Sequence, residues 1–138
     1  MDITVVANTD VDKVWSRIEG YAEGCAKYTY GRFTANDIRT GIRKGVQTLW
    51  VAHEGERILG FVVTELQDYP QLRALVMHFT GGVRLNKWKS SMLAKIQEHA
   101  KMNGADRIES YGREGWAKVF EKDGFKSLHN FYELPVGN

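Results

Sequence analysis

The sequence lacks the features that mark several classes of protein. It holds one cysteine, Cys25, in 138 residues, which excludes an intrachain disulfide framework and fits a reducing, intracellular setting. No segment approaches the roughly 20 apolar residues that a membrane span needs. The first residues, MDITVVANTD, include an acidic second residue and no long apolar stretch, so we expect no secretory signal. We therefore expect a cytoplasmic protein with no membrane span.

The sequence also lacks a large net charge and the residue spacing of a metal site. The formal net charge of +2 is small, and no recognition motif accompanies it, so we do not expect a nucleic-acid partner. The four histidines show no paired spacing, so we expect no metal site. No repeats, low-complexity tracts or linkers interrupt the chain, and its 43% hydrophobic and 26% charged residues are near globular averages. We expect a single domain over residues 1–138.

What the sequence does contain is hydrophobic periodicity of two kinds, which predicts a mixed α/β fold. Segments with β-branched residues and period-two alternation are interspersed with apolar residues at helical spacing. Three of the strands follow one another in series, which favours an antiparallel meander. We predict strands over residues 3–7, 46–53, 58–66, 72–80, 106–110, 125–128 and 131–134, and helices over residues 11–26, 34–45, 86–104 and 113–122. The expectation is a mixed, mostly antiparallel sheet of about six to seven strands flanked by four helices.

Capping residues predict where the helices begin. Asp12 follows Thr9 by three residues, and Asp37 follows Thr34 in the same way; both pairs are typical of capping boxes. Asn86 can cap the long helix of the second half. Between the first two helices the sequence leaves an aromatic loop, YTYGRF, that is free to cover another part of the molecule.

A group of cations lies where the long helix begins. Arg84, Lys87 and Lys89 belong to the stretch GGVRLNKWKS, which follows a predicted strand. The unpaired N–H groups and the positive end of the dipole make such a helix start an anion site. The same charges also suit an ordinary solvated surface, and both interpretations stay open at this point.

The order of the elements resembles that of the GNAT superfamily of N-acetyltransferases over essentially the whole chain. The most specific segments are LWVAHEGERILGFVV, which is similar to the central hairpin of the family, and WAKVFEKDGF, which is similar to its late helix. The resemblance implies a GNAT-like fold and acetyl-coenzyme A as the cofactor, with an amine of a small molecule or protein as acceptor. It also implies a V-shaped opening where the third meander strand splays from the following parallel strand.

The resemblance implies candidate site residues as well. The pantetheine arm would pair with the third meander strand, and the pyrophosphate would rest on the loop and helix start beyond it. Glu65, with Asp68 just past it, and His78 are candidate bases, and Tyr111 is a candidate acid. The alternatives are solvated carboxylates, a packed histidine and a surface tyrosine. The candidate cofactor-binding residues are Met77, Phe79, Thr80, Arg84, Lys87, Trp88, Lys89, Ser90, Arg113 and Phe120.

The sequence departs from the family pattern at several of these positions. Lys87 and Lys89 stand where the family's phosphate loop has small residues, usually glycine, and Arg113 stands where an asparagine is common. Lysine can bind phosphate as a point charge. Phe120 stands where a tyrosine often protonates the leaving thiolate, and phenylalanine has no proton to give. The alternative hypothesis is therefore a catalytically eroded GNAT-like domain, of a kind found among bacteriophage proteins, that serves as a binding or structural protein (a phage virion or regulatory component). It predicts a homodimer or a complex with a protein partner.

Overall fold

The computed structural model describes residues 1–112 and 121–137. Its elements follow in the order that the periodicity predicts for the first 110 residues, with a short 3-10 turn, η1, before the first long helix. The elements are β1 (Asp2–Val6), η1 (Asn8–Asp10), α1 (Val11–Ala26), α2 (Ala35–Arg43), β2 (Thr48–Glu54), β3 (Arg57–Asp68), β4 (Arg73–Gly82), α3 (Leu85–Met102) and β5 (Arg107–Ser110).

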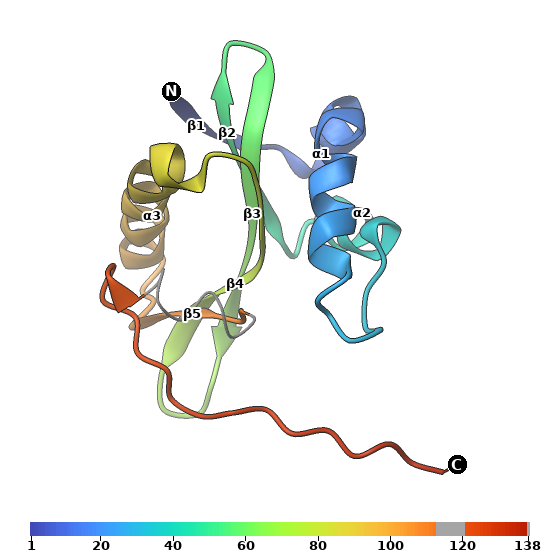
Figure 1. Ribbon diagram of the computed structural model, residues 1–138. Coiled ribbons are helices and arrows are strands. Elements are labelled where there is room, and N and C mark those ends of the chain that lie inside the picture. The colour runs from blue at the N-terminus through green and yellow to red at the C-terminus, as the bar shows by residue number, and fades with distance from the viewer. Residues whose placement is uncertain (113–120, 138) are drawn as a thin grey trace.

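The strands form one mixed sheet in the order β1-β2-β3-β4-β5. Neighbours from β1 to β4 are antiparallel, which confirms the predicted meander, and β5 is parallel to β4. Helices α1 and α2 cover one face of the sheet and α3 covers the other (Figure 1). This architecture confirms the predicted mixed α/β class with a mixed, mostly antiparallel sheet.

Two hydrophobic cores, one on each face of the sheet, follow from the alternation of side chains along the strands. Phe61, Val63 and Phe79 pack against α1 and α2, whereas Leu75 and Met77 pack against α3. Successive residues of a strand point to opposite faces, so strands that are apolar at nearly every position supply both cores at once. Among the described helices, none is both long enough and apolar enough to cross a lipid bilayer.

The capping box at the start of α2 is confirmed, and the one predicted before α1 is wrong. The backbone N–H of Asp37 donates to the Thr34 hydroxyl at 3.1 Å, and the N–H of Thr34 donates to the Asp37 carboxylate at 2.9 Å. Thr9 and Asp12 make no such pair, because Asn8–Asp10 form a 3-10 turn that leads directly into α1. Continuous helical backbone removes the extended residue that a capping box requires.

The predicted cap of the long helix is also wrong. Asn86 lies within the first turn of α3, and Arg84 occupies the capping position with a left-handed backbone, φ +54°. The loop is shorter than expected, because β4 continues to Gly82 and Val83 is still tied back to the sheet through its N–H, which donates to the Leu59 carbonyl at 2.7 Å. The helix therefore begins two residues earlier than the side chains suggest.

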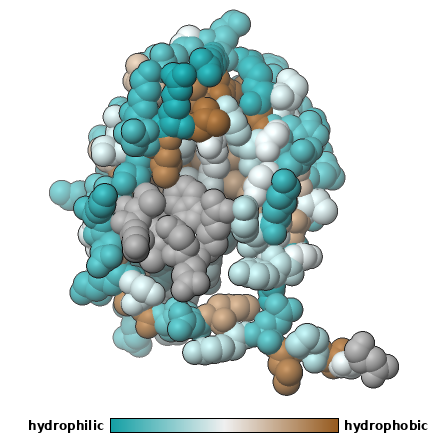
Figure 2. Space-filling model, in the orientation of Figure 1, coloured by the Kyte–Doolittle hydropathy of each residue, from teal (hydrophilic) through white to brown (hydrophobic). Residues whose placement is uncertain are grey.

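The two predicted closing strands, residues 125–128 and 131–134, are wrong, because the described C-terminal segment has no regular secondary structure. A short run of β-forming residues becomes a strand only when a sheet edge pairs with it. The apolar side chains of this segment are exposed, among them Phe131 at 75% and Leu134 at 88%, and Figure 2 shows hydrophobic groups along it where it leaves the body of the molecule. The helix predicted over 113–122 lies almost wholly outside the described residues, which hold five strands and three α-helices.

Candidate active site

An opening in the sheet lies where β4 and β5 part. Their parallel pairing runs from Ala74 opposite Arg107 to Met77 opposite Ser110. Beyond that point β4 continues to Gly82 (Figure 1), with no strand beside it on this edge among the described residues. Its outward N–H and C=O groups need hydrogen-bond partners, and the amides of an extended ligand can supply them.

A β-bulge lies at the point where this opening begins. Val63 of β3 pairs with Phe79 of β4, and Thr64 pairs with Met77, so His78 is an extra residue in β4. A bulge bends its strand and redirects the side chain of the extra residue. The His78 and Phe79 rings lie on the same side of the sheet, 6.1 Å apart between their centroids, which strict alternation along the strand would not allow.

The bulge brings two of the predicted catalytic residues into direct contact. Nε2 of His78 lies 3.0 Å from Oε1 of Glu65, and the two side chains are 24% and 30% exposed. A carboxylate oxygen only accepts hydrogen bonds, so Nε2 of His78 carries the proton and donates it. In the neutral ring Nδ1 then holds the lone pair, which is the group that a general base needs.

Tyr111, the third predicted catalytic residue, lies beside the same pair. Its ring stacks on that of His78, with centroids 6.4 Å apart and planes inclined by 18°, and its side chain is largely exposed. Phe33 of the aromatic loop meets Phe79, the neighbour of His78, edge to face at 5.2 Å. The loop thus reaches β4, which the sequence did not specify. Glu65, His78 and Tyr111 therefore converge from β3, β4 and the end of β5.

The predicted cofactor-binding residues of β4 offer backbone groups more than side chains. Met77 and Phe79 are only 2% and 8% exposed, because their side chains fill the two cores. Thr80 is half-buried, and its carbonyl accepts a hydrogen bond from Sγ of Cys25 at 3.2 Å. A ligand beside this stretch meets mainly its backbone edge.

Trp88 supports the loop after β4 from inside the α3 core. Its side chain is 1% exposed, and its Nε1 donates to the Val83 carbonyl at 2.8 Å. Gly60 makes room for the indole, since a Cβ on Gly60 would overlap the ring. Gly82, at φ +132°, lies close against the backbone of Leu59 in a similar way. The Trp88 ring therefore braces the loop and points into the core, away from the surface.

The two lysines at the start of α3 each contact a carboxylate. Nζ of Lys87 lies 2.8 Å from Oε1 of Glu54, and Nζ of Lys89 lies 2.9 Å from Oδ2 of Asp123. The hydrogen bond from Lys87 lowers the pKa of Glu54 below its ordinary value. A cavity of about 490 Å³ opens here, lined by Arg84, Leu85, Asn86, Lys89 and Lys122. Cationic side chains and a helix N-terminus together make it suitable for an anion.

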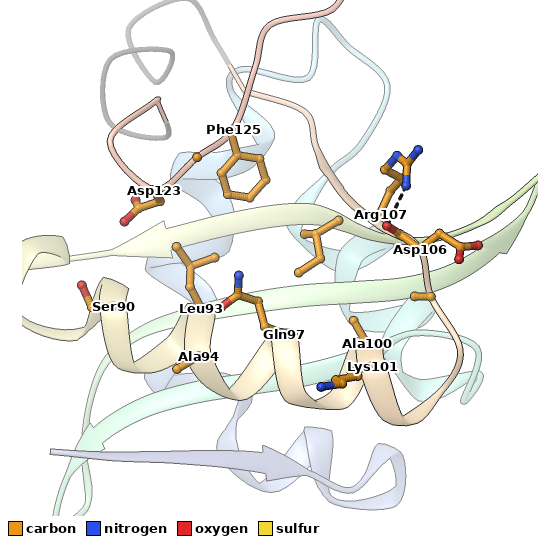
Figure 3. A pocket seen from close by; sticks show the side chains of 13 residues that line it. Ser90, Leu93, Ala94, Gln97, Ala100, Lys101, Asp106, Arg107, Asp123 and Phe125 are labelled. Carbon is orange, nitrogen blue, oxygen red and sulfur yellow. Dashed lines mark hydrogen bonds between the residues drawn. The ribbon is translucent and has the colours of Figure 1, made fainter.

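A second cavity, of about 460 Å³, lies between α3, β5 and residues 123–125. In Figure 3, Phe125 points toward α3, and Leu93 and Gln97 point up toward it. Ser90 lines this cavity and not the cationic one. The predicted site residues Arg113 and Phe120 lie outside the described residues. Over the part of the chain that is described, no three His, Cys, Asp or Glu side chains are grouped as a metal site requires.

Sequence reasoning missed Gln47, Glu54, Lys122 and Asp123 as neighbours of the site. Lys122 is the last residue of the predicted late helix, Asp123 follows it, and Glu54 ends β2. Glu54 and Asp123 are therefore distant in sequence from Lys87 and Lys89, which they contact. Their carboxylate and ammonium groups are the only signal in the sequence, and such groups are frequent on any protein surface. Only the packing of the segments shows that they meet.

Comparison with known proteins yields structural matches without sequence matches. No family model matches the chain, and no curated protein sequence does. A protein described as a probable acetyltransferase superposes with a TM-score of 0.76 at 18% identity, over 100% of this chain and 99% of that one. A ribosomal-protein-alanine N-acetyltransferase from Brucella melitensis biovar Abortus 2308 gives 0.75 at 13% identity, over 99% and 100%. A predicted acetyltransferase with acetyl-CoA from Clostridium acetobutylicum gives 0.70 at 16% identity, over 98% and 96%. The chain therefore has the GNAT-like fold that these acetyltransferase structures share.

Proposed function

We propose that this protein is an acyl-coenzyme A-dependent N-acetyltransferase that moves an acetyl group from acetyl-coenzyme A to an amine of a small molecule or protein. The observation that carries the proposal is the His78–Glu65 hydrogen bond at the bulge where β4 leaves β5. It sets a candidate base beside an open strand edge, in a fold that a structure solved with acetyl-CoA shares. A cytoplasmic location, which the single cysteine supports, is part of the proposal.

The residues present fit acetyl-coenzyme A in two ways. The edge of β4 from His78 to Gly82 has backbone groups that can pair with the amides of a pantetheine arm. The cationic cavity at the start of α3, with Arg84 and Lys89 in its wall, suits the phosphates. Phosphate oxygens would then share Lys89 with Asp123. When bound, the thioester supplies an activated acetyl group.

The chain's own residues can perform the proton transfers that the reaction needs. An amine of ordinary pKa is protonated at neutral pH, so it must lose a proton before it attacks the thioester carbonyl. Nδ1 of His78 accepts that proton, and the Glu65 carboxylate stabilises the resulting imidazolium. As the C–N bond forms and the C–S bond breaks, the hydroxyl of Tyr111, which stacks on His78, would donate its proton to the departing thiolate. The second proton of the newly attached nitrogen would restore the Tyr111 hydroxyl, and the imidazolium would release its proton to solvent. Backbone N–H groups of β4 can stabilise the oxyanion.

Calorimetry with acetyl-coenzyme A, followed by thiol-release assays with a panel of amines, tests the proposal. We expect saturable binding and thiol release that depends on the amine. Des-acetyl coenzyme A serves as a control, because it retains the phosphates and the pantetheine arm but has no acetyl group to transfer. An absence of binding at millimolar cofactor would rule out the enzyme.

A second candidate role, self-association of a GNAT-like protein, is favoured by the C-terminal segment. Four of its large apolar side chains are 75–88% exposed: Leu128, Phe131, Tyr132 and Leu134. Phe131 and Glu133 contact Arg32 of the aromatic loop, at 5.2 Å and 3.6 Å. Aromatic side chains bury on the order of 150–250 Å² each, so two such segments exchanged in a homodimer approach the area of about 1,000 Å² that a specific interface needs.

Light scattering tests this second role on the full chain and on a variant that ends at residue 126. We expect a dimer of the full chain and a monomer of the shortened one. A full chain that stays monomeric at about 100 μM, well above the micromolar Kd of many modest interfaces, would contradict the homodimer.

A further inference from the structure

Gln47, which precedes β2, extends the Glu65–His78 pair by one hydrogen bond. Its Nε2 donates to Oε1 of Glu65 at 3.3 Å, and the same oxygen accepts from Nε2 of His78 at 3.0 Å. Gln47 is half-buried. Its amide nitrogen is a neutral donor with no acceptor capacity, so it can hold a carboxylate without adding a charge that competes with the imidazole.

A glycine in α2 provides the space in which Gln47 lies. A Cβ on Gly41 would be 2.6 Å from Oε1 of Gln47 and 3.3 Å from its Cδ. Glycine is a poor residue for a helix interior, and Gly41 lies within Ala35–Arg43. By contrast, a Cβ on Gly20 in α1 meets nothing within 4 Å. Glycine at position 41 is therefore explained by the Gln47 amide, which occupies the space of a Cβ, whereas no such contact explains glycine at position 20.

We propose that Gln47, seated against Gly41, is a positioning residue for the Glu65–His78 pair. It holds the Glu65 carboxylate in the orientation that receives the Nε2 proton of His78 and so leaves Nδ1 as the basic nitrogen. Glu65 is about one-third exposed, so without a second donor its carboxylate would occupy several rotamers and exchange partners with water. The catalytic consequence rests on the proposed acetyltransferase function, but the hydrogen-bonding consequence does not.

The contact can be broken without removing any of the functional groups. In the variant Gly41→Ala, the added methyl group collides with the end of a flexible side chain, so the Gln47 amide must move. Alanine suits a helix better than glycine, so the helix itself is not weakened. Gly20→Ala is the matched control, since it makes the same change in a helix where the Cβ meets nothing. Gln47→Ala and the double variant G41A/Q47A complete a cycle.

Two measurements separate positioning from a merely structural role. The first is nitrogen NMR of the His78 ring in the protein without cofactor, assigned with His78→Gln, which reports the tautomer and the solvent exchange of the Nε2 proton. The second is steady-state kinetics of acetyl transfer. We expect G41A and Q47A to expose the Nε2 proton to exchange and to lower kcat about tenfold, the size that one charge-assisted hydrogen bond implies, with KM for acetyl-coenzyme A unchanged.

The cycle of G41A, Q47A and G41A/Q47A tests whether Gly41 acts through Gln47. In the Q47A background we expect G41A to cause no further change in kcat or in exchange of the His78 Nε2 proton, because the side chain that it displaces is already absent. We expect G20A to have the kcat and proton exchange of the original protein. If His78 shows the same tautomer and proton exchange in G41A, Q47A and G20A, the positioning role is wrong. If the NMR changes occur but the original protein transfers no acetyl group, the proposed function fails and the positioning role stands.

Discussion

Replacing Trp88 with phenylalanine tests whether the α3 core holds the loop after β4 in place. The indole is 1% exposed and donates one hydrogen bond, to the Val83 carbonyl at 2.8 Å. Phenylalanine removes that donor and takes about three heavy atoms out of the core. The lost burial alone lowers the free energy of unfolding by about 2 kcal/mol, at about 0.8 kcal/mol per buried group. The lost hydrogen bond adds about 0.5–1.5 kcal/mol. Val83 is 43% exposed, so water can reach its carbonyl and the lower end of that range applies.

We therefore expect W88F to lower the free energy of unfolding by about 2–3 kcal/mol, measured by urea denaturation with an unchanged m-value. Gly60→Ala, whose Cβ would overlap the indole, should also destabilise the protein, by about 1–3 kcal/mol. The two changes should be less than additive, because the smaller ring leaves room for the methyl group. A loss below about 1 kcal/mol in W88F, or full additivity, would refute this packing of Trp88 beneath the loop.

Three further predictions concern the site and the surface. His78→Gln should lower kcat for acetyl transfer by about 10²–10⁴-fold and leave the Kd of acetyl-coenzyme A unchanged, which calorimetry and thiol release together can check; an unchanged kcat would exclude His78 as the base. Lys89→Met should weaken acetyl-coenzyme A binding about tenfold, and equal affinity would remove Lys89 from the anion site. Hydrogen bonds from Arg39 and then Arg43 lower the pKa of Asp12. A carboxyl group whose pKa is lower in the folded protein stabilises the fold above its unfolded-state pKa, and this stabilisation is lost as the pH falls through its folded-state pKa. Asp12→Asn should therefore flatten the fall in Tm below about pH 4; equal slopes in both proteins would contradict this.

Local patterns predicted the elements whose formation depends on neighbours in sequence. The capping box of Thr34 and Asp37 spans three residues, and the apolar stripe of α1 repeats every turn, so both are visible in the sequence. The bulge at His78 is not, because it arises from the register between β3 and β4. The closing strands are wrong for a related reason: residues 125–134 include aromatic and apolar residues typical of strands, but no described strand pairs with them.

By itself, the sequence determined the order and type of most elements, the fold class, and the presence of a carboxylate, an imidazole and a phenol near the ends of strands. Only the tertiary structure decided that Glu65 and His78 share a hydrogen bond, that Gln47 joins them, and that Trp88 faces the core. The partners in this cluster are 13 and 18 residues apart in sequence. Their meeting depends on strand register and helix packing, which no local pattern encodes.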